Sequence, residues 1–166
     1  TVYAADQLFA TLDPTLRRLE LPDIGPVVMA DTVGFIRHLP HKLVEAFRAT
    51  LEETTEASIL LHIIDCHDHR RDENMEQVEE VLAEIGADEI PVLQVFNKID
   101  LLDNFQPRVE RNEDGVPVRV WVSAVTGEGL EGLFDTIVER LAEDVIHQFV
   151  LLGPTDGKLQ IGRAHV

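Results

Sequence analysis

The sequence of 166 residues lacks the features that define several classes of protein. Its single cysteine, Cys66, excludes an internal disulfide framework and is typical of a protein in a reducing compartment. It contains no run of roughly 18 apolar residues, the length that a membrane helix needs. Residues 1–10 also lack the basic start and apolar stretch of a signal peptide. These absences predict a cytoplasmic protein without a transmembrane segment.

Basic residues are also scarce. Lys and Arg number 14 against 31 Asp and Glu, which gives a formal net charge of −17. This charge favours solubility but disfavours loose binding to nucleic acid phosphates, so we expect no direct DNA binding. An RNA partner would have to meet a local basic surface or a domain outside this sequence. Hydrophobic residues make up 45% of the chain, as in a globular domain with a buried core, but composition alone indicates no function.

Short apolar runs with the spacing of β-strands alternate with longer runs of helical spacing. Strands are predicted at residues 16–21, 27–31, 59–65, 92–97 and 118–123. Helices are predicted at residues 42–55, 74–85 and 129–143. Gly86 and Pro91 mark the exit from the second of these helices into the next strand.

This alternation predicts an α/β fold, with a mainly parallel sheet covered by helices on both faces. The runs at residues 59–64 and 92–96 are almost continuously apolar, as buried parallel strands should be. Residues 16–21 alternate with charged side chains, which predicts an edge strand, and the polar residues 104–117 predict a surface connection. Ligands of such sheets bind beyond the carboxyl ends of the strands, so the residues that follow each strand are the candidates for function.

The first candidate is Asp31-Thr32-Val33-Gly34, at the end of a predicted strand. An aspartate at this place can hold Mg²⁺ through water, and a glycine lets a backbone N–H approach a terminal phosphate. The D-x-x-G pattern is short, and a simple aspartate turn is the alternative.

The second candidate is Asn97-Lys98-Ile99-Asp100. The Asp100 carboxylate can accept both the ring N1–H and the exocyclic amine of guanine, an arrangement that adenine does not offer. Because an unpaired buried carboxylate is costly, this contact would discriminate guanine from adenine. Asn97 would tie neighbouring loops together, and the stem of Lys98 would lie along the base plane. An ordinary polar loop at the end of a strand is the alternative.

The third candidate is Ser123-Ala124-Val125, which begins at the end of the last predicted strand. Its small residues would let backbone amides reach the guanine carbonyl oxygen, and Ser123 would brace the base-binding loop. The same segment could serve as a helix N-cap, since Thr126 stands just before the last predicted helix.

The fourth candidate, Phe9-Ala10-Thr11-Leu12-Asp13, lies before the first strand. A threonine on a mobile loop can give its hydroxyl to Mg²⁺ and its N–H to a γ-phosphate, which orders the loop when the triphosphate is bound. An ordinary turn before a strand is the alternative.

The order of these motifs, a switch threonine, D-x-x-G, N-K-x-D and then S-A, is that of Ras-like GTPases. The stretches YAADQLFATLDPTLRR (residues 3–18), DTVGFIRHLP (residues 31–40) and LVEAFRATLE (residues 43–52) resemble the HflX family of GTPases, a similarity that extends to about Lys158. The resemblance implies a Ras-like P-loop GTPase fold. It also implies a cytosolic protein that hydrolyses GTP, associates with the large ribosomal subunit and acts in ribosome splitting or rescue. We further expect a monomer.

By the same resemblance the four motifs would bind GTP or GDP, with Mg²⁺ as the cofactor. Thr11 and Asp31 would be the metal ligands, and Asn97, Lys98 and Asp100 would read guanine. Phe35 stands where Ras-type enzymes carry the water-orienting glutamine. No catalytic residue is therefore predicted, and another group or a partner must place the attacking water.

One motif of this fold is missing. The sequence contains no G-x-x-x-x-G-K-[ST], the loop whose amides and lysine hold the phosphates. In the family this loop precedes the switch threonine, and the chain begins only ten residues before Thr11. We therefore expect a GTPase domain at residues 1–147 without its first strand, its phosphate loop and most of its first helix, which by itself is inactive. A non-catalytic interaction domain with a Ras-like fold is the alternative.

Two further segments need an interpretation. Residues 148–160 are predicted to begin a C-terminal extension. Residues 161–166, IGRAHV, do not continue the family pattern and resemble translated sequencing-adapter sequence, with a genuine short tail as the alternative. The cluster His67-Asp68-His69 suggests a metal site, but its spacing does not match zinc patterns, so a solvated loop at a strand end is favoured.

Overall fold

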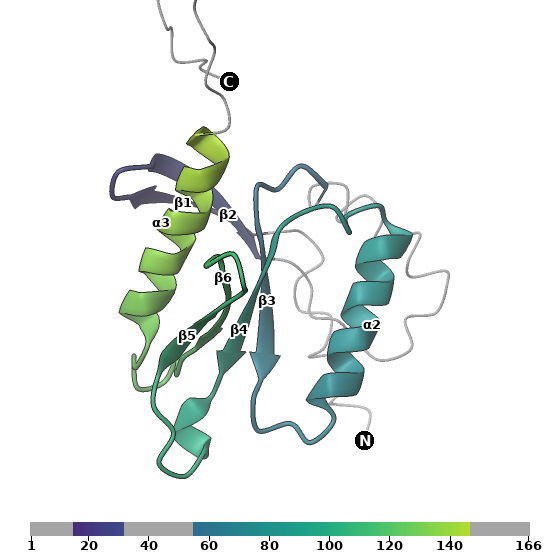
Figure 1. Cartoon of the computed structure of the whole chain (residues 1–166), viewed down its shortest axis with the longest axis vertical. Helices are drawn as coiled ribbons and strands as arrows, with labels where there is room; N and C mark the ends of the chain where they lie inside the picture. The colour runs from purple at the N-terminus through teal and green to yellow at the C-terminus, as the bar shows by residue number, and fades with distance from the viewer. Residues whose placement is uncertain (1–14, 32–54, 147–166) are drawn as a thin grey trace, which may run out of the picture.

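A computed structural model describes residues 15–31 and 55–146 of the chain. Its strands are β1 (Thr15–Leu21), β2 (Gly25–Asp31), β3 (Leu60–Asp65), β4 (Val92–Asn97), β5 (Arg108–Arg111) and β6 (Pro117–Trp121). Its helices are α2 (Arg71–Glu84), the short 3-10 helix η1 (Ile99–Leu101) and α3 (Leu130–Ile146). Figure 1 shows α2 beside β3 at one side of the sheet and α3 near β5 and β6 at the other.

The main sheet has four strands in the order β3-β4-β6-β5. β3, β4 and β6 run parallel, and β5 pairs with β6 in the antiparallel direction. The parallel register sets Ile63 opposite Val95, which in turn lies opposite Val120. This arrangement confirms the predicted α/β fold with a mainly parallel sheet.

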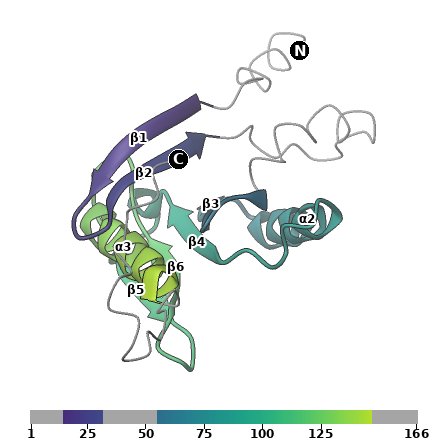
Figure 2. The ribbon, with the colours of Figure 1, turned by 90° about the horizontal axis from the view of Figure 1, so that it is seen from above.

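Different helices cover the two faces of this sheet, because successive side chains of a strand point to opposite faces. One face carries buried side chains in and just after β4 and β6 that pack against α3: Leu93, Val95, Val120 and Val122. The other face carries two clusters, one around Ile64, Phe96 and Trp121 and one that includes Val78 and Leu82 of α2. Viewed from above, α2 and α3 lie on either side of the strands (Figure 2).

Helix α2 ends in a glycine motif that turns the chain toward β4. Gly86 has a φ of 75°, in the left-handed region that a glycine adopts without strain. The N–H groups of Gly86 and Ala87 donate to the carbonyls of Ala83 and Leu82 at 3.2 and 2.8 Å. These are the two hydrogen bonds of a Schellman motif, completed by the buried contact between Ala87 and Leu82. The predicted role of Gly86 is confirmed.

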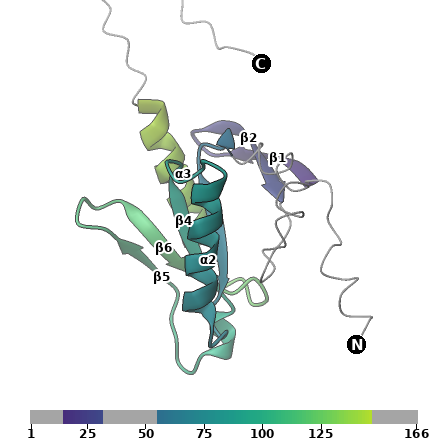
Figure 3. The same ribbon diagram turned by 90° about the vertical axis from the view of Figure 1, so that its right-hand side faces the viewer.

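β1 and β2 form a separate, two-stranded antiparallel sheet, in which Thr15 lies opposite Asp31. Within the described residues no ladder joins this hairpin to the four-stranded sheet. Of residues 16–31, Leu21 alone is buried. Figure 3 shows the hairpin on one side of α2 and the β5–β6 pair on the other. The prediction of an edge strand at residues 16–21 is confirmed, because each strand of a two-stranded sheet has a free edge.

The prediction that residues 104–117 form a surface connection is wrong in part, since β5 lies within them. Charged side chains occupy most of this short strand, so no apolar alternation marks it. Backbone pairing with β6 holds it, and ion pairs flank it: the Arg119 guanidinium donates to Glu110 at 2.7 Å. The guanidinium of Arg111 donates to both carboxylate oxygens of Glu139 on α3, at 2.5 and 2.8 Å. Such partners are distant in sequence and leave no local pattern.

The other predicted elements within the described residues agree with the structure to within about one helical turn. The helix predicted at residues 42–55 lies outside the described part except for its last residue, and the segments 148–160 and 161–166 lie wholly outside it. The domain boundary at residue 147 stays a prediction. In residues 15–31 and 55–146, no helix is long and apolar enough to cross a membrane.

Candidate functional site

Two loops meet at the carboxyl end of the four-stranded sheet: the Asn97 loop (residues 97–101), after β4, and the Ser123 loop (residues 123–129), after β6. They are adjacent because β4 and β6 are parallel neighbours. The N–H of Val122 donates to the carbonyl of Phe96 at 2.9 Å, and the N–H of Ile99 donates to the carbonyl of Val122 at 3.2 Å. The Ile99 side chain is buried, which anchors the Asn97 loop to the sheet below it.

Asn97 joins the two loops through its side chain. Its Oδ1 accepts the N–H of Lys98 at 2.8 Å and the N–H of Ala124 at 3.0 Å. The first bond stabilises the turn within the Asn97 loop, and the second reaches the Ser123 loop. The predicted tie between neighbouring loops is therefore present.

A second link joins Asp100 to Ser123. The Ser123 hydroxyl donates to Oδ1 of Asp100 at 2.5 Å and accepts the N–H of Thr126 at 3.1 Å. Ser123 is fully buried, whereas Asp100 is exposed. A buried hydroxyl thus orients a carboxylate that faces solvent, where a ligand could donate hydrogen bonds to it.

The Ser123 loop turns tightly before α3. The N–H of Gly127 donates to the Ser123 carbonyl at 2.9 Å. Gly129 has a φ of 78°, and a Cβ at this position would lie 2.5 Å from the backbone oxygen of Trp121, so only glycine fits there. The interpretation of Thr126 as the helix N-cap is wrong: α3 begins at Leu130, and the N–H of Glu128 donates to the Thr126 hydroxyl at 3.4 Å within a turn.

An aromatic stack supports both loops, and the sequence motifs did not reveal it. The rings of Phe96 and Trp121 stack with centroids 5.0 Å apart and an interplanar angle of 14°. The Arg108 guanidinium lies 4.3 Å from the centroid of Trp121, and Phe105 is tilted against the same ring. Such ring pairs contribute about 0.5–1.5 kcal/mol beyond the area that they bury. One aromatic residue at the end of each strand was a visible signal, but their contact depends on the strand register.

Lys98 turns back toward the end of β3. Its backbone has a φ of 70°, and its ammonium lies 2.5 Å from Oδ2 of Asp65. This hydrogen bond lowers the pKa of the Asp65 carboxyl. The same bond raises the pKa of the Lys98 ammonium, to which the negative charge of Asp100 also contributes. Both partners are therefore charged at neutral pH.

A family model and known proteins match most of this chain. A family model described as "50S ribosome-binding GTPase" matches residues 1–98. GTPase HflX of Escherichia coli strain K12 is 58% identical over 159 residues, which cover 96% of this chain. GTPase HflX of Magnetococcus marinus is 42% identical over 160 residues, or 95% of the chain. The chain belongs to the HflX family of GTPases.

The chain spans 37% and 36% of the lengths of these two HflX proteins. Among solved structures, a GTP-binding protein of Sulfolobus solfataricus in complex with GDP superimposes with a TM-score of 0.63 and 26% identity, over 83% of this chain and 49% of that one. Era in complex with MgGDPNP and nucleotides of 16S ribosomal RNA has a TM-score of 0.53 and 25% identity, over 78% and 45%. The fold is thus the α/β fold of P-loop GTPases.

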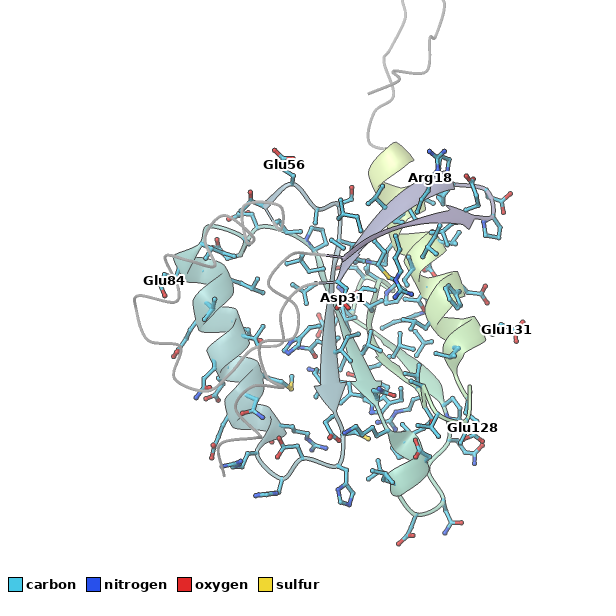
Figure 4. The ribbon with its side chains drawn as sticks, turned by 180° about the vertical axis from the view of Figure 1, so that it is seen from behind. Arg18, Asp31, Glu56, Glu84, Glu128 and Glu131 are labelled. Atoms are coloured by element: carbon cyan, nitrogen blue, oxygen red, sulfur yellow. The ribbon has the colours of Figure 1, made fainter. Side chains whose placement is uncertain are left out.

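The residues predicted for an HflX-type site are only partly brought together. Most residues predicted to meet the phosphates and the metal lie outside the described residues: Phe9, Ala10, Thr11, Leu12, Asp13, Thr32, Val33 and Gly34. Phe35 lies outside them as well. Asp31 ends β2 with an exposed side chain. Figure 4 shows it near the amino-terminal end of β3, well away from Glu128 of the Ser123 loop. The hairpin is a separate sheet, so no strand register brings Asp31 to the two loops.

The metal that the HflX resemblance implies rests on Thr11 and Asp31, of which the structure describes Asp31. An exposed carboxylate at a strand end is a suitable oxygen ligand for Mg²⁺. Within the described ranges, no group of three or more His, Cys, Asp or Glu side chains could hold a metal ion. After β3, Asp68 instead accepts the N–H of Arg70 at 2.9 Å and the amide of Asn74 at 3.0 Å, which holds the start of α2.

Proposed function

We propose that the chain is part of a GTP-binding and GTP-hydrolysing protein of the HflX type. The observation that carries the proposal is the geometry of the Asn97 and Ser123 loops. Asn97 and Ser123 each hydrogen-bond across to the other loop, and the Ser123 hydroxyl orients the exposed Asp100 carboxylate. A carboxylate held in this way can accept the N1–H and the exocyclic amine of guanine together.

The small residues Ala124 and Val125 would leave room for the base and let backbone amides reach the guanine carbonyl oxygen. Val125 is 84% exposed, so a ligand can approach this part of the Ser123 loop. Ile99 would hold the loop in place from below, since it is buried in the core. Lys98 would place its stem along the base plane.

The phosphates would be met by the segments around Thr11 and Asp31, with the amide of Gly34 close to the γ-phosphate. Mg²⁺, held by Thr11 and Asp31, would neutralise charge on the phosphate oxygens, which requires the hairpin to bring Asp31 from the amino-terminal end of β3 to the edge with the two loops. Catalysis would be mainly electrostatic, with water attacking the γ-phosphate. Since Phe35 cannot orient water by a hydrogen bond, that role falls to another group or to a partner.

The test of base recognition is the substitution Asp100→Asn in the complete gene product. The amide would donate where guanine also donates, so affinity for GDP should fall about 100-fold or more. Affinity for xanthosine diphosphate should rise, because xanthine offers a carbonyl in place of the exocyclic amine. Asp103→Asn, which changes a neighbouring exposed acid, is the matched control and should leave the affinity for GDP unaltered. Unchanged GDP binding by Asp100→Asn would contradict the proposal.

The 166-residue chain taken alone is proposed to hydrolyse no GTP at a measurable rate, because its sequence contains no G-x-x-x-x-G-K-[ST] loop. The same absence favours the second candidate function, a non-catalytic interaction domain with a Ras-like fold. Calorimetry with GTP and GDP on this chain distinguishes the two cases. Tight GTP binding would show that the missing loop is less important than its chemistry suggests.

We also propose that the protein associates with the large ribosomal subunit, acts in ribosome splitting or rescue, and works as a cytoplasmic monomer. The description of the matching family, a 50S ribosome-binding GTPase, supports the ribosomal partner. Sedimentation of the complete gene product with isolated large subunits tests it. More protein should sediment with a non-hydrolysable GTP analogue than with GDP, and equal amounts would count against nucleotide-dependent binding.

A further inference from the structure

Asp65 lies beside the Asn97 loop although it comes 33 residues before Lys98 in the sequence. It is the last residue of β3, and the parallel register sets it opposite Asn97. The N–H of Cys66 donates to the carbonyl of Asn97 at 3.0 Å, which extends the ladder by one residue. The backbone therefore fixes where the Asp65 carboxylate can be.

The carboxylate itself is held through both of its oxygens. Oδ1 accepts the N–H of His67 at 2.9 Å, and Oδ2 accepts the ammonium of Lys98 at 2.5 Å. A carboxylate fixed by a backbone N–H cannot easily follow a moving lysine. It thus acts as a stationary partner that limits the rotamers of Lys98.

The backbone of Lys98 is strained. A φ of 70° is uncommon for a residue with a side chain, and such strain gathers at ligand-binding sites. The hydrogen bond from the Lys98 N–H to Oδ1 of Asn97 maintains this conformation. As a result the side chain runs from the Asn97 loop to the end of β3.

The Asp65–Lys98 pair contributes little to the stability of the fold. The two side chains are 37% and 48% exposed, and exposed ion pairs contribute little to folding because water screens them and long side chains lose entropy. A strained lysine held in a weakly stabilising pair is explained better by a role at the adjacent site. Asp100, the proposed guanine acceptor, is only two residues away in the same loop.

We propose that Asp65 is a positioning residue for guanine-nucleotide recognition: it holds the Lys98 ammonium at the end of β3, so that the lysine stem is already in place when the base arrives. The inference rests on the proposed function. Asp65 acts only through Lys98 and touches no nucleotide. Asp65→Asn should therefore weaken GDP binding about three- to thirtyfold, through loss of preorganisation.

The experiment is a double-mutant cycle on the complete gene product, with GDP dissociation constants measured for the unaltered protein, Asp65→Asn, Lys98→Met and the double variant. If Asp65 acts through Lys98, the Asp65→Asn change has no further effect once Lys98 is replaced. A purely structural role would weaken binding by the same factor in both backgrounds. The thermal midpoint of each variant shows whether the fold is retained.

Asp68→Asn is the matched control. Asp68 stands in the same loop region and also accepts a backbone N–H, but its other hydrogen bond goes to Asn74 and not to Lys98. It should leave GDP affinity unchanged. Equal GDP affinity of Asp65→Asn and the unaltered protein, or independent effects in the cycle, would overturn the inference alone. If the unaltered protein binds no guanine nucleotide, the proposed function fails and the inference fails with it.

Discussion

The β1–β2 hairpin and the core of the four-stranded sheet are built from strands of similar length but differ in what surrounds them. β1 has seven residues and β4 has six, and both have regular ladders. In the hairpin Leu16 is 58% exposed and Val28 is 67% exposed, whereas Leu93 of β4 is fully buried. The backbone pairing is comparable, so the difference lies in side-chain packing.

This difference extends to the candidate site. At the end of β4 and β6, a buried aromatic stack lies below loops that are joined by the side chains of Asn97 and Ser123. At the end of the hairpin, Asp31 is exposed and its sheet has no ladder to the main one within the described residues. A strand end becomes a defined site when the sheet beneath it is packed and its loops are joined to each other.

The largest expected contrast comes from the same substitution in the two regions. Leu93→Ala should lower the free energy of unfolding by about 2–5 kcal/mol, because it leaves a cavity in a fully buried cluster. Leu16→Ala should change it by no more than about 0.5 kcal/mol, since the side chain is mostly in water. Urea denaturation followed by circular dichroism measures both. Similar losses would show that the hairpin is packed as firmly as the sheet.

The Ser123 loop offers the next contrast. Ser123→Ala removes a buried hydroxyl that serves both Asp100 and the N–H of Thr126, and should cost about 1–2 kcal/mol. Thr126→Ala removes only exposed contacts with Glu128 and should cost less than about 0.5 kcal/mol. Thermal unfolding compares the two variants. The proposal that Ser123 braces the loop would be abandoned if both variants were equally stable.

A smaller contrast is expected between two ion pairs. Glu139→Gln breaks a bidentate pair with Arg111 and should cost about 0.5–1 kcal/mol, whereas Glu20→Gln breaks a 3.7 Å pair with Arg18 on the hairpin and should cost almost nothing. The bond to Arg111 lowers the pKa of Glu139 below its ordinary 4.5. The contribution of this pair to the free energy of unfolding is therefore present above pH 4.5 and is lost as the pH falls through the lowered pKa of Glu139.

The stabilities of Glu139→Gln and the unaltered chain should accordingly converge in acid. Urea midpoints at pH 7 and at pH 3 test this. A difference that stays constant between the two would mean that the Arg111 pair does not depend on the Glu139 charge.

The smallest expected effect concerns His62 of β3. Burial lowers its pKa below the ordinary 6.5, and the negative charge of Glu79 opposes this only in part. The unfolded chain therefore binds a proton at His62 more readily than the folded chain does. His62 does not reduce the stability of the fold above pH 6.5, but it lowers that stability as the pH falls below 6.5. The thermal midpoint should drop between pH 7.5 and 5.5, and His62→Gln should reduce this drop. An equal drop in the variant would exclude His62 as its source.

The local spacing of apolar residues predicted much of the fold, because it reflects which side chains are buried in each strand and helix. β4 was predicted at both ends, since an apolar run begins after Pro91 and stops at Asn97. β5 was missed because three of its four residues are charged and its position depends on pairing with β6. The separation of the hairpin from the main sheet was not predicted either, because strand propensity says nothing about which strand lies next to which.

The same limit applied to the site. Asn97, Asp100 and Ser123 were found because their order along the chain carries the signal. Asp65 and Trp121 were not singled out as parts of the site, since their roles follow from neighbours on other strands. Thr126 was interpreted as a possible N-cap because it stands close to a helix in the sequence. A tight turn at Gly129 lies between Thr126 and the first residue of α3, Leu130, so Thr126 is not at the cap position.

The sequence by itself determined the family, the alternation of strands and helices, and the residues that end each strand, because these depend on composition, local spacing and the order of motifs. The tertiary structure decided which strand ends meet. Parallel pairing of β4 with both β3 and β6 brings Asp65, Asn97 and Ser123 to one edge, whereas the hairpin leaves Asp31 elsewhere. Register between distant strands is set by how the whole sheet buries its apolar faces, and no short stretch of sequence contains that information.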